Sequence, residues 1–340
     1  APYSEAFATS RAVMHLHNVA YQGLFPLDSI SDIGVNPDDA RSGGPLEFYN
    51  QLSFLKAGIV SADILVTVSP TYSNEITTGA EFGHGMEGIL THRSDMLFGV
   101  LNGVENEIWN PETDSHIPNQ YSVDDFVEGK AANKVALQEQ FRLPVDPDIP
   151  LIGMISRLAD QKGLDLLADV EKDLLNLPVQ FVFLGVGDER YESMLRKWAE
   201  QYPDKVVAVL KFNNDLANLI EAGADIFLMP SKFEPCGLNQ MYSLLYGTIP
   251  VVRRTGGLAD TVESYNIKDG TGNGFVFDEY DGTAMLVALK QAIGLFDNKP
   301  AWQMLQKQGM ESDFSWERSA DEVNKLYQDV LSRPAYINNV

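Results

Sequence analysis

Residues 224–253 read ADIFLMPSKFEPCGLNQMYSLLYGTIPVVR, and this stretch decides the fold. The apolar run 224–230 predicts a buried strand, and the polar, glycine-containing segment after it predicts a loop that opens a helix near 238–246. A second apolar run at 249–253 predicts the next strand. Strands that are apolar throughout have helices on both faces, so the stretch is typical of a strand–helix–strand unit in a parallel sheet.

The same alternation extends outward on both sides of this unit. The pattern predicts further strands at 150–156, 179–185, 206–212 and 274–277, and helices near 164–174, 190–202, 214–222, 257–265 and 282–295. A series of about six such repeats predicts an α/β protein with a doubly wound parallel sheet.

The sequence before residue 143 is less regular, but it also contains strand-like runs. Three apolar runs end in polar or glycine residues, as strands of a parallel sheet do, at 12–18, 63–69 and 97–103. Ligands of open α/β sheets bind beyond the carboxyl ends of the strands, so these ends are candidate binding positions.

The domain boundaries follow from a proline-rich segment. Residues 143–150 read LPVDPDIP, which disfavours regular structure and predicts a linker. We therefore expect a first domain over 1–142, a second over 151–313 and a C-terminal segment over 314–340. The amphipathic pattern near 316–332 predicts a last helix that packs on another part of the protein.

Composition limits the possible partners and compartment. The chain has 340 residues with 25 Lys and Arg against 48 Asp and Glu, a net charge of −23 that disfavours binding to nucleic acid or an anionic membrane. No stretch approaches the roughly 18 apolar residues that span a bilayer. Cys236 is the only cysteine, which excludes an internal disulfide and favours a reducing compartment. We expect a cytoplasmic protein, or a plastid protein if the source is a plant or alga.

Two glycine-containing loops carry the densest polar clusters. In the first, 231–238, Glu234 stands directly before a helix and either caps it or faces a ligand. In the second, 254–260, Gly256 and Gly257 either let the backbone approach a ligand or form a tight turn. A third segment, GVGD at 185–188, lacks the third glycine of a dinucleotide-binding pattern, which disfavours nicotinamide or flavin binding.

Basic residues are scarce, yet Arg157, Lys162 and Arg253 lie at the ends of predicted strands. Arg157 and Lys162 flank one strand-to-helix loop, where they either pair with acids such as Asp160 or clamp a phosphate. We favour the phosphate clamp, because an acidic protein that binds a diphosphate must concentrate its cations at the site.

His15 and His17 end the first predicted strand, and Asn18 follows them. Residues two apart on a strand point to the same face, so a two-histidine metal site is one interpretation. The other histidines are scattered and no carboxylate recurs at metal-ligand spacing, so we expect no metal and no other cofactor.

Long motifs along almost the whole chain resemble the bacterial glycogen synthase and plant starch synthase family of retaining glycosyltransferases. They are HNVAYQGLF at 17–25, VSPTYSNEI at 68–76, GVLNGVENEIWNPETD at 99–114, ISRLADQKG at 155–163, MPSKFEPCGLNQM at 229–241, VVRRTGGLADTV at 251–262 and FSWERSA at 314–320. The resemblance implies the GT-B architecture, in which two Rossmann-like domains face a cleft and the last helix crosses back to the first domain.

The resemblance also implies roles for individual residues. Glu234 lies beside the donor glucose, and Arg157 and Lys162 hold the diphosphate and stabilise the leaving group. His17 meets the sugar near its anomeric centre. The other implied substrate-binding residues are Asn18, Asn102 and Gln161; Cys236, Gly237 and Leu238, whose N–H groups meet glucose hydroxyls; Thr255, Gly256, Gly257 and Leu258, the last three at the distal phosphate; and Phe212, which stacks on adenine.

Two departures from the family pattern stand out. Family members begin with a strand that leads into a Lys-x-Gly-Gly-Leu loop, which this sequence lacks, so we expect a first domain that is incomplete or is completed by a separate chain or segment. Glu105 stands where the family usually has Asp, which lengthens one side chain in a loop near the hinge.

The expected function is transfer of glucose from ADP-glucose to the non-reducing end of an α-1,4-glucan, glycogen or starch, with retention and without a metal. One alternative is a fragment, inactive or half of a split enzyme, that only binds nucleotide sugar or glucan. Another is a related transferase that uses UDP-glucose. The expected partners are ADP-glucose, ADP and the glucan, with no nucleic acid and no membrane.

Overall fold

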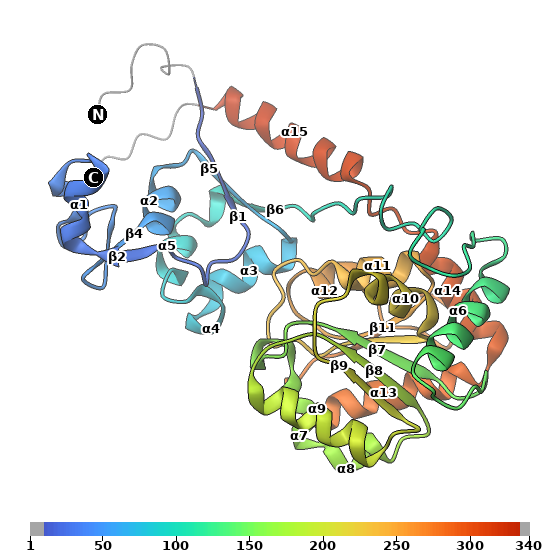
Figure 1. Cartoon of the computed structure of the whole chain (residues 1–340). Helices are drawn as coiled ribbons and strands as arrows, with labels where there is room; N and C mark the ends of the chain where they lie inside the picture. Colours follow the sequence, from blue (N-terminus) through green and yellow to red (C-terminus); the bar gives the residue numbers. More distant parts are fainter. Residues whose placement is uncertain (1–9, 334–340) are drawn as a thin grey trace. The chain divides into compact units, whose positions relative to one another are not determined.

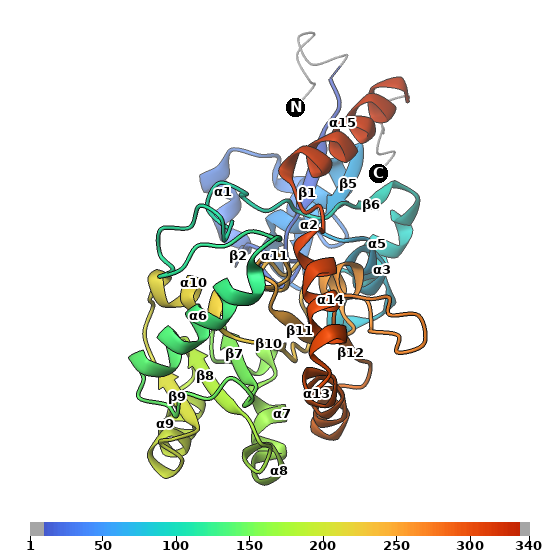
Figure 2. The ribbon, with the colours of Figure 1, turned by 90° about the vertical axis from the view of Figure 1, so that its right-hand side faces the viewer.

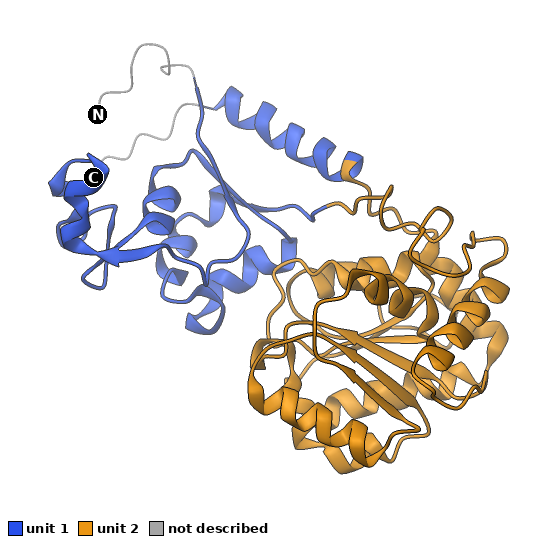
Figure 3. Cartoon of the chain, in the orientation of Figure 1, with its two compact units in different colours: residues 1–102, 317–340 blue, residues 103–316 orange. Residues whose placement is uncertain are grey.

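The structure is a computed structural model that describes residues 10–333, so the outer ends of the predicted segments 1–142 and 314–340 lie outside the described residues. The chain divides into two compact units, which Figure 3 colours separately: unit 1 comprises 1–102 and 317–340, and unit 2 comprises 103–316. Each unit contains a parallel sheet. Within residues 10–333, no helix is long and apolar enough to cross a membrane.

Unit 2 is built on a six-stranded sheet in the order β12-β11-β10-β7-β8-β9, and all of its strand pairs are parallel (Figure 1). Counted along the chain, the first strand of this sheet lies beside the fourth, so the strand order reverses between β7 and β10, as in doubly wound nucleotide-binding folds. The strands are β7 (Leu151–Ile155), β8 (Gln180–Leu184), β9 (Val206–Val209), β10 (Ile226–Met229), β11 (Ile249–Arg253) and β12 (Phe275–Phe277).

Helices cover both faces of this sheet (Figure 1 and Figure 2). Successive strand residues point to opposite faces, and Phe181 and Val182 of β8 accordingly belong to two different apolar clusters. Each fully buried side chain of that size contributes roughly 1.5–3 kcal/mol. The helices are α6 (Phe126–Gln140), α7 (Leu164–Asp169), α8 (Glu171–Leu175), α9 (Glu189–Gln201), α10 (Asn214–Gly223), α11 (Asn239–Leu245), α12 (Gly256–Thr261), α13 (Gly282–Phe296), α14 (Lys299–Met310) and the 3₁₀ turn η5 (Asp160–Lys162).

The division between the units differs from the boundary at 143–150 that the proline-rich segment suggested. Helix α6, which precedes that segment, packs against α10, and the buried ammonium of Lys130 donates a hydrogen bond to the carbonyl oxygen of Ala222 at 2.9 Å. Residues 103–142 therefore belong to unit 2. Residues 143–150 connect α6 to β7 inside this unit, so proline content marked a loop rather than a domain boundary.

Unit 1 contains a parallel sheet in the order β1-β5-β6 and an antiparallel sheet in the order β2-β4-β3. Helix α15 (Trp316–Ser332) belongs to this unit, since Val330 joins the apolar cluster of Ile64 and Val66. The other elements are β1 (Val13–Leu16), β2 (Leu24–Pro26), β3 (Glu47–Phe48), β4 (Gln51–Ser53), β5 (Ile64–Thr67), β6 (Leu97–Gly99), α1 (Ile30–Ile33), α2 (Phe54–Ser61), α3 (Pro70–Thr78), α4 (Ala80–Gly83), α5 (Glu87–His92) and the 3₁₀ turns η2 (Leu27–Ser29), η3 (Pro37–Ala40) and η4 (Ser94–Met96).

Candidate functional site

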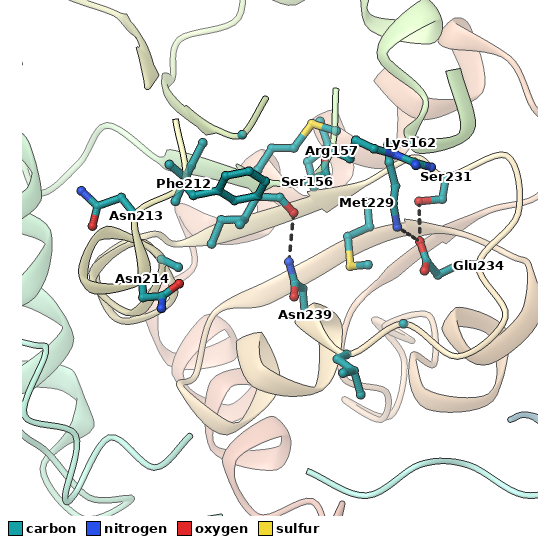
Figure 4. Close-up of a pocket in the computed structure, with 18 of the residues that line it drawn as sticks. Ser156, Arg157, Lys162, Phe212, Asn213, Asn214, Met229, Ser231, Glu234 and Asn239 are labelled. Atoms are coloured by element: carbon teal, nitrogen blue, oxygen red, sulfur yellow. Dashed lines mark hydrogen bonds and ion pairs between the residues drawn. The ribbon is translucent and has the colours of Figure 1, made fainter. Parts of the chain in front are cut away.

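A pocket of about 310 Å³ opens in unit 2 at the carboxyl ends of the strands, where the strand order reverses (Figure 4). Such switch points are where open α/β sheets bind ligands, because successive loops diverge there. Six residues predicted from the sequence line this pocket together: Arg157, Lys162, Phe212, Glu234, Gly237 and Leu238. Polar residues that the sequence did not single out line it as well, namely Ser156, Lys211, Asn213, Asn214, Ser231 and Asn239.

Two loops that are distant in sequence are fastened together on one side of the pocket. The N–H of Lys232, after β10, donates to the carbonyl oxygen of Gln161, after β7, at 2.8 Å. Gly163 has a φ of 76° and packs so closely that a Cβ there would stand 2.2 Å from the carbonyl oxygen of Pro230. Only glycine combines this conformation with this approach. The contact brings the preceding residue, Lys162, to the loop that follows β10.

An ion pair results at the wall of the pocket. The ammonium of Lys162 lies 2.5 Å from Oε2 of Glu234, and the hydroxyl of Ser231 donates to the same oxygen at 3.1 Å (Figure 4). The side chains are largely buried, with exposed fractions of 21% for Lys162 and 10% for Glu234. In a partly dehydrated setting this attraction is stronger than on the surface. An anion that enters the pocket therefore competes with Glu234 for the lysine.

Arg157 remains exposed at the pocket and is oriented by a neighbouring amide. Its Nη2 donates to Oε1 of Gln161 at 2.9 Å. Asp160, the alternative partner considered from the sequence, instead accepts hydrogen bonds from the hydroxyl of Tyr191 and the guanidinium of Arg190. Both hydrogen bonds lower the pKa of Asp160, the one from Tyr191 more than the one from Arg190. The local carboxylate is thus occupied elsewhere, and Arg157 stays available to a ligand.

Arg253, the third basic residue at a strand end, has a structural role. Its guanidinium is buried and donates to the carbonyl oxygens of Ser231 at 3.1 Å and Lys232 at 2.5 Å. These bonds fix the start of the loop that carries Glu234.

The two glycine-containing loops lie against each other. A Cβ on Gly257 would stand 1.8 Å from the carbonyl oxygen of Cys236, and the N–H of Gly257 donates to the carbonyl oxygen of Glu234 at 3.1 Å. The N–H of Leu258 donates to the carbonyl oxygen of Thr255 at 3.0 Å. These amides are therefore bonded within the protein, so the glycines serve close approach of two loops. Their contact with a distal phosphate stays a prediction.

The opposite end of the pocket presents an aromatic ring. Phe212 follows β9 and is 87% exposed, so one side of the ring is available for stacking. The next residue, Asn213, caps α10 by accepting a hydrogen bond from the N–H of Leu216 at 3.0 Å. An asparagine before a helical pattern is a recognisable cap signal, which could have marked this residue in the sequence.

A buried polar network lies beneath α11. Glu221 of α10 is 1% exposed and accepts a hydrogen bond from the hydroxyl of Ser243 at 2.7 Å. Burial raises the pKa of Glu221 to about 8, against the effects of Ser243 and of the nearby Lys130. Burial likewise lowers the pKa of Lys130 to about 7. None of these residues lines the pocket described above, so the network supports the helix rather than a ligand.

Three further predicted residues belong to unit 1. His17 and Asn18 directly follow β1, and Asn102 follows β6. His15, the other half of the candidate histidine pair, lies 3.1 Å from the hydroxyl of Tyr327 in α15. Partial burial, and then the charge of His17, lower the pKa of His15. The contacts of His17, Asn18 and Asn102 with a sugar stay predictions.

Comparison with known proteins agrees with this geometry. Residues 1–92 match the starch synthase catalytic domain family, and residues 137–299 match glycosyl transferases group 1. The glycogen synthase of Thermosipho melanesiensis is 48% identical over 330 residues, which cover 97% of this chain and 68% of that protein. The glycogen synthase of Anaeromyxobacter dehalogenans is 49% identical over 325 residues, covering 95% and 67%. The chain thus spans about two thirds of the length of these relatives.

Solved structures show the same relationship. The catalytic domain of starch synthase IV from Arabidopsis thaliana, bound to ADP and acarbose, has a TM-score of 0.88 and 34% identity over 95% of this chain and 67% of that one. Sucrose-phosphate synthase from Thermosynechococcus elongatus shares the fold, with a TM-score of 0.57 and 17% identity over 94% and 68%. The fold is therefore of the GT-B class. The chain belongs to the glycogen synthase and starch synthase family of glycosyltransferases.

Proposed function

We propose that this protein transfers glucose from ADP-glucose to the non-reducing end of an α-1,4-glucan, with retention of configuration at the anomeric carbon. The observation that carries the proposal is the pocket of unit 2, in which two cations and a carboxylate meet on one wall and an exposed aromatic ring stands at the other end. A nucleoside diphosphate sugar has the same order of parts: a base, two phosphates and a sugar. The starch synthase with ADP bound, at 34% identity, supports this donor.

Charge development explains the cationic wall. As the glycosidic bond to the donor breaks, negative charge grows on the diphosphate and positive charge grows on the sugar ring. Arg157 and Lys162, already present at the pocket, stabilise the leaving diphosphate without help from a metal. Glu234 stabilises the positive charge on the sugar.

The ion pair between Lys162 and Glu234 links these two effects. In the structure Lys162 neutralises Glu234 at 2.5 Å. A diphosphate that draws the ammonium towards itself leaves the carboxylate with more of its negative charge facing the sugar. Donor binding thereby prepares the site for the transition state, which is where additional electrostatic attraction accelerates a reaction.

The aromatic end of the pocket supports adenine as the base. Phe212 offers a largely exposed ring, and stacking increases with the size of the base, so a purine gains more than uracil. Cys236 is a buried cysteine that forms no disulfide, which fits the reducing cytoplasm as the place proposed for this reaction.

The test compares donors and a variant of the carboxylate. The purified chain is incubated with glycogen and radiolabelled ADP-glucose or UDP-glucose, and calorimetry measures binding of ADP and UDP. We expect transfer from ADP-glucose into a product that an α-1,4-specific glucosidase digests, and ADP binding tighter than UDP binding. Glu234→Gln should abolish transfer without weakening ADP binding, because Lys162 is then released for the phosphates, whereas Glu279→Gln, at an exposed site outside the pocket, should change neither.

Three outcomes contradict the proposal in different ways. Lack of ADP binding at millimolar nucleotide removes the assigned pocket. A preference for UDP-glucose keeps the pocket and corrects the donor. Donor binding without transfer by the chain makes it a nucleotide-sugar-binding protein.

A further inference from the structure

Gln240 lies directly beneath the loop that carries Glu234 and is fully buried, with 0% of its surface exposed. It is the second residue of α11 and does not line the pocket. We propose that Gln240 is a positioning residue that turns the peptide groups of this loop so that the N–H groups of Gly237 and Leu238 face the donor sugar. The inference rests on the proposed function, because it assigns these amides to the glucose of the bound donor.

The amide of Gln240 holds the inner side of the loop. Its Nε2 lies 3.1 Å from the carbonyl oxygen of Cys236, 3.1 Å from that of Gly237 and 3.1 Å from the hydroxyl oxygen of Thr261. The hydroxyl of Thr261 in turn donates to the carbonyl oxygen of Gly257 at 2.6 Å. Since the N–H of Gly257 donates to the loop at Glu234, Gln240 completes a ring of hydrogen bonds that joins both glycine-containing loops.

The orientation of the amides follows from peptide geometry. No peptide bond within residues 10–333 is cis, and in a trans peptide the C=O and the following N–H point in opposite directions. Because the carbonyl groups of Cys236 and Gly237 point down to Gln240, the N–H groups of Gly237 and Leu238 point away from it. Both of these residues line the pocket. Within the described part of the chain, no group accepts a hydrogen bond from either amide.

The glycine at position 237 leaves space for the side chain of Gln240. Gly237 has a φ of 68°, and a Cβ there would stand 2.5 Å from Oε1 of Gln240. Oε1 is buried and, among the described residues, has no hydrogen-bond partner. A buried amide oxygen without a hydrogen-bond partner costs stability, so the favourable contribution of Gln240 lies in the groups that its Nε2 holds. A donor at this position keeps the two carbonyl groups turned inward, and the glycine leaves room for it.

The experiment separates sugar recognition from nucleotide recognition. Gln240→Met keeps the length and volume of the side chain, removes the donor and also removes the unsatisfied oxygen. We expect affinity for ADP-glucose to fall about tenfold, since two hydrogen bonds to the sugar are lost, while affinity for ADP alone stays within twofold. Calorimetry with each ligand measures both values on the full chain.

A matched control is present in the same unit. Gln306 is also a buried glutamine, 6% exposed, whose Nε2 donates to the carbonyl oxygen of Gly247 at 2.7 Å, away from the pocket. Gln306→Met should lower the melting temperature without changing either affinity. If Gln240→Met does not fold, Gly237→Ala provides a second test. The added Cβ would collide with Oε1 of Gln240 and displace the same two amides, so this variant should show the same selective loss of affinity for ADP-glucose.

The outcomes distinguish the inference from the proposed function. Equal loss of ADP and ADP-glucose affinity, or no loss at all, in a folded Gln240→Met or Gly237→Ala variant shows that Gln240 does not position sugar-binding amides. If the unsubstituted chain binds neither ligand, the proposed function fails, and this inference fails with it. If the unsubstituted chain binds both and only ADP-glucose binding falls, the positioning role is established.

Discussion

Gly257 is the point at which the two glycine-containing loops touch, and we predict that Gly257→Ala disables the site while leaving the fold intact. A Cβ at this position would stand 1.8 Å from the carbonyl oxygen of Cys236, whereas real Cβ contacts essentially never fall below 3.0 Å. The carbonyl group must therefore move by at least the difference of 1.2 Å. Because Cys236 and Glu234 lie in the same loop, 231–238, this movement also displaces Glu234.

The size of the effect follows from this displacement. A shift of about 1 Å in reacting groups costs about 100-fold in rate, so we expect glucose transfer to fall by about that factor. Overpacking costs about 1–3 kcal/mol, a minor part of the 5–15 kcal/mol by which a folded domain is typically stable. For a unit of this size that corresponds to a decrease of about 2–12 °C in melting temperature.

The assay combines the initial rate of glucose transfer to glycogen with thermal unfolding of the same preparation. Gly294→Ala is the control, because nothing lies within 4 Å of a Cβ built at this position of α13. Replacing an interior helix glycine by alanine should stabilise the protein by about 0.5–1 kcal/mol and leave transfer unchanged. A Gly257→Ala variant with the rate of the unsubstituted protein would refute the reasoning, because the loop would then not control the site.

Substitutions at three other positions test separate parts of the account. Arg157→Ala should weaken ADP binding by about 1.5–3 kcal/mol in calorimetry, since charge-assisted hydrogen bonds are lost. An unchanged affinity would show that Arg157 does not contact the phosphates. Phe212→Ala should weaken ADP binding by about 0.5–1.5 kcal/mol, whereas Phe212→Tyr should preserve it; equal effects would exclude stacking. Because burial raises the pKa of Glu221 from 4.5 to about 8, the folded protein keeps a proton that the unfolded chain releases, and stability falls as pH rises through this range. Glu221→Gln should flatten the dependence of melting temperature on pH between 5 and 8, and an unaltered slope would show that Glu221 titrates normally.

The sheet of unit 2 could be predicted from the sequence because its strands are apolar on both faces. Helix α6 could not, since Lys130, Asn133, Lys134 and Gln138 are all buried on it. These polar side chains find partners in distant parts of the chain, so hydrophobic periodicity does not reveal the helix. The proline-rich segment after it then looked like a domain boundary, although it is a loop within unit 2.

The candidate site could likewise be predicted from the sequence only in part. Glu234 and the cations near it could be singled out because each stands where a predicted strand ends. The ion pair between Lys162 and Glu234 joins residues 72 positions apart, and it depends on a hydrogen bond between two loops that no local pattern encodes. Gln240 gave no signal at all, because a buried glutamine inside a short helix has no characteristic spacing.

The assignment of α15 to unit 1 has a consequence for the order of folding during synthesis. Arg11 donates a hydrogen bond to the carbonyl oxygen of Arg333, 322 residues later, and Val330 completes the apolar cluster beside β5. At about 5–20 residues per second, a ribosome needs roughly 10–40 s to synthesise the intervening unit 2. Throughout that time the strands of unit 1 lack their last helix, while unit 2 receives every element it requires. The strands of unit 1, although synthesised before unit 2, therefore complete their folding after it, and their unpaired apolar surface is the part that a nascent-chain chaperone must protect.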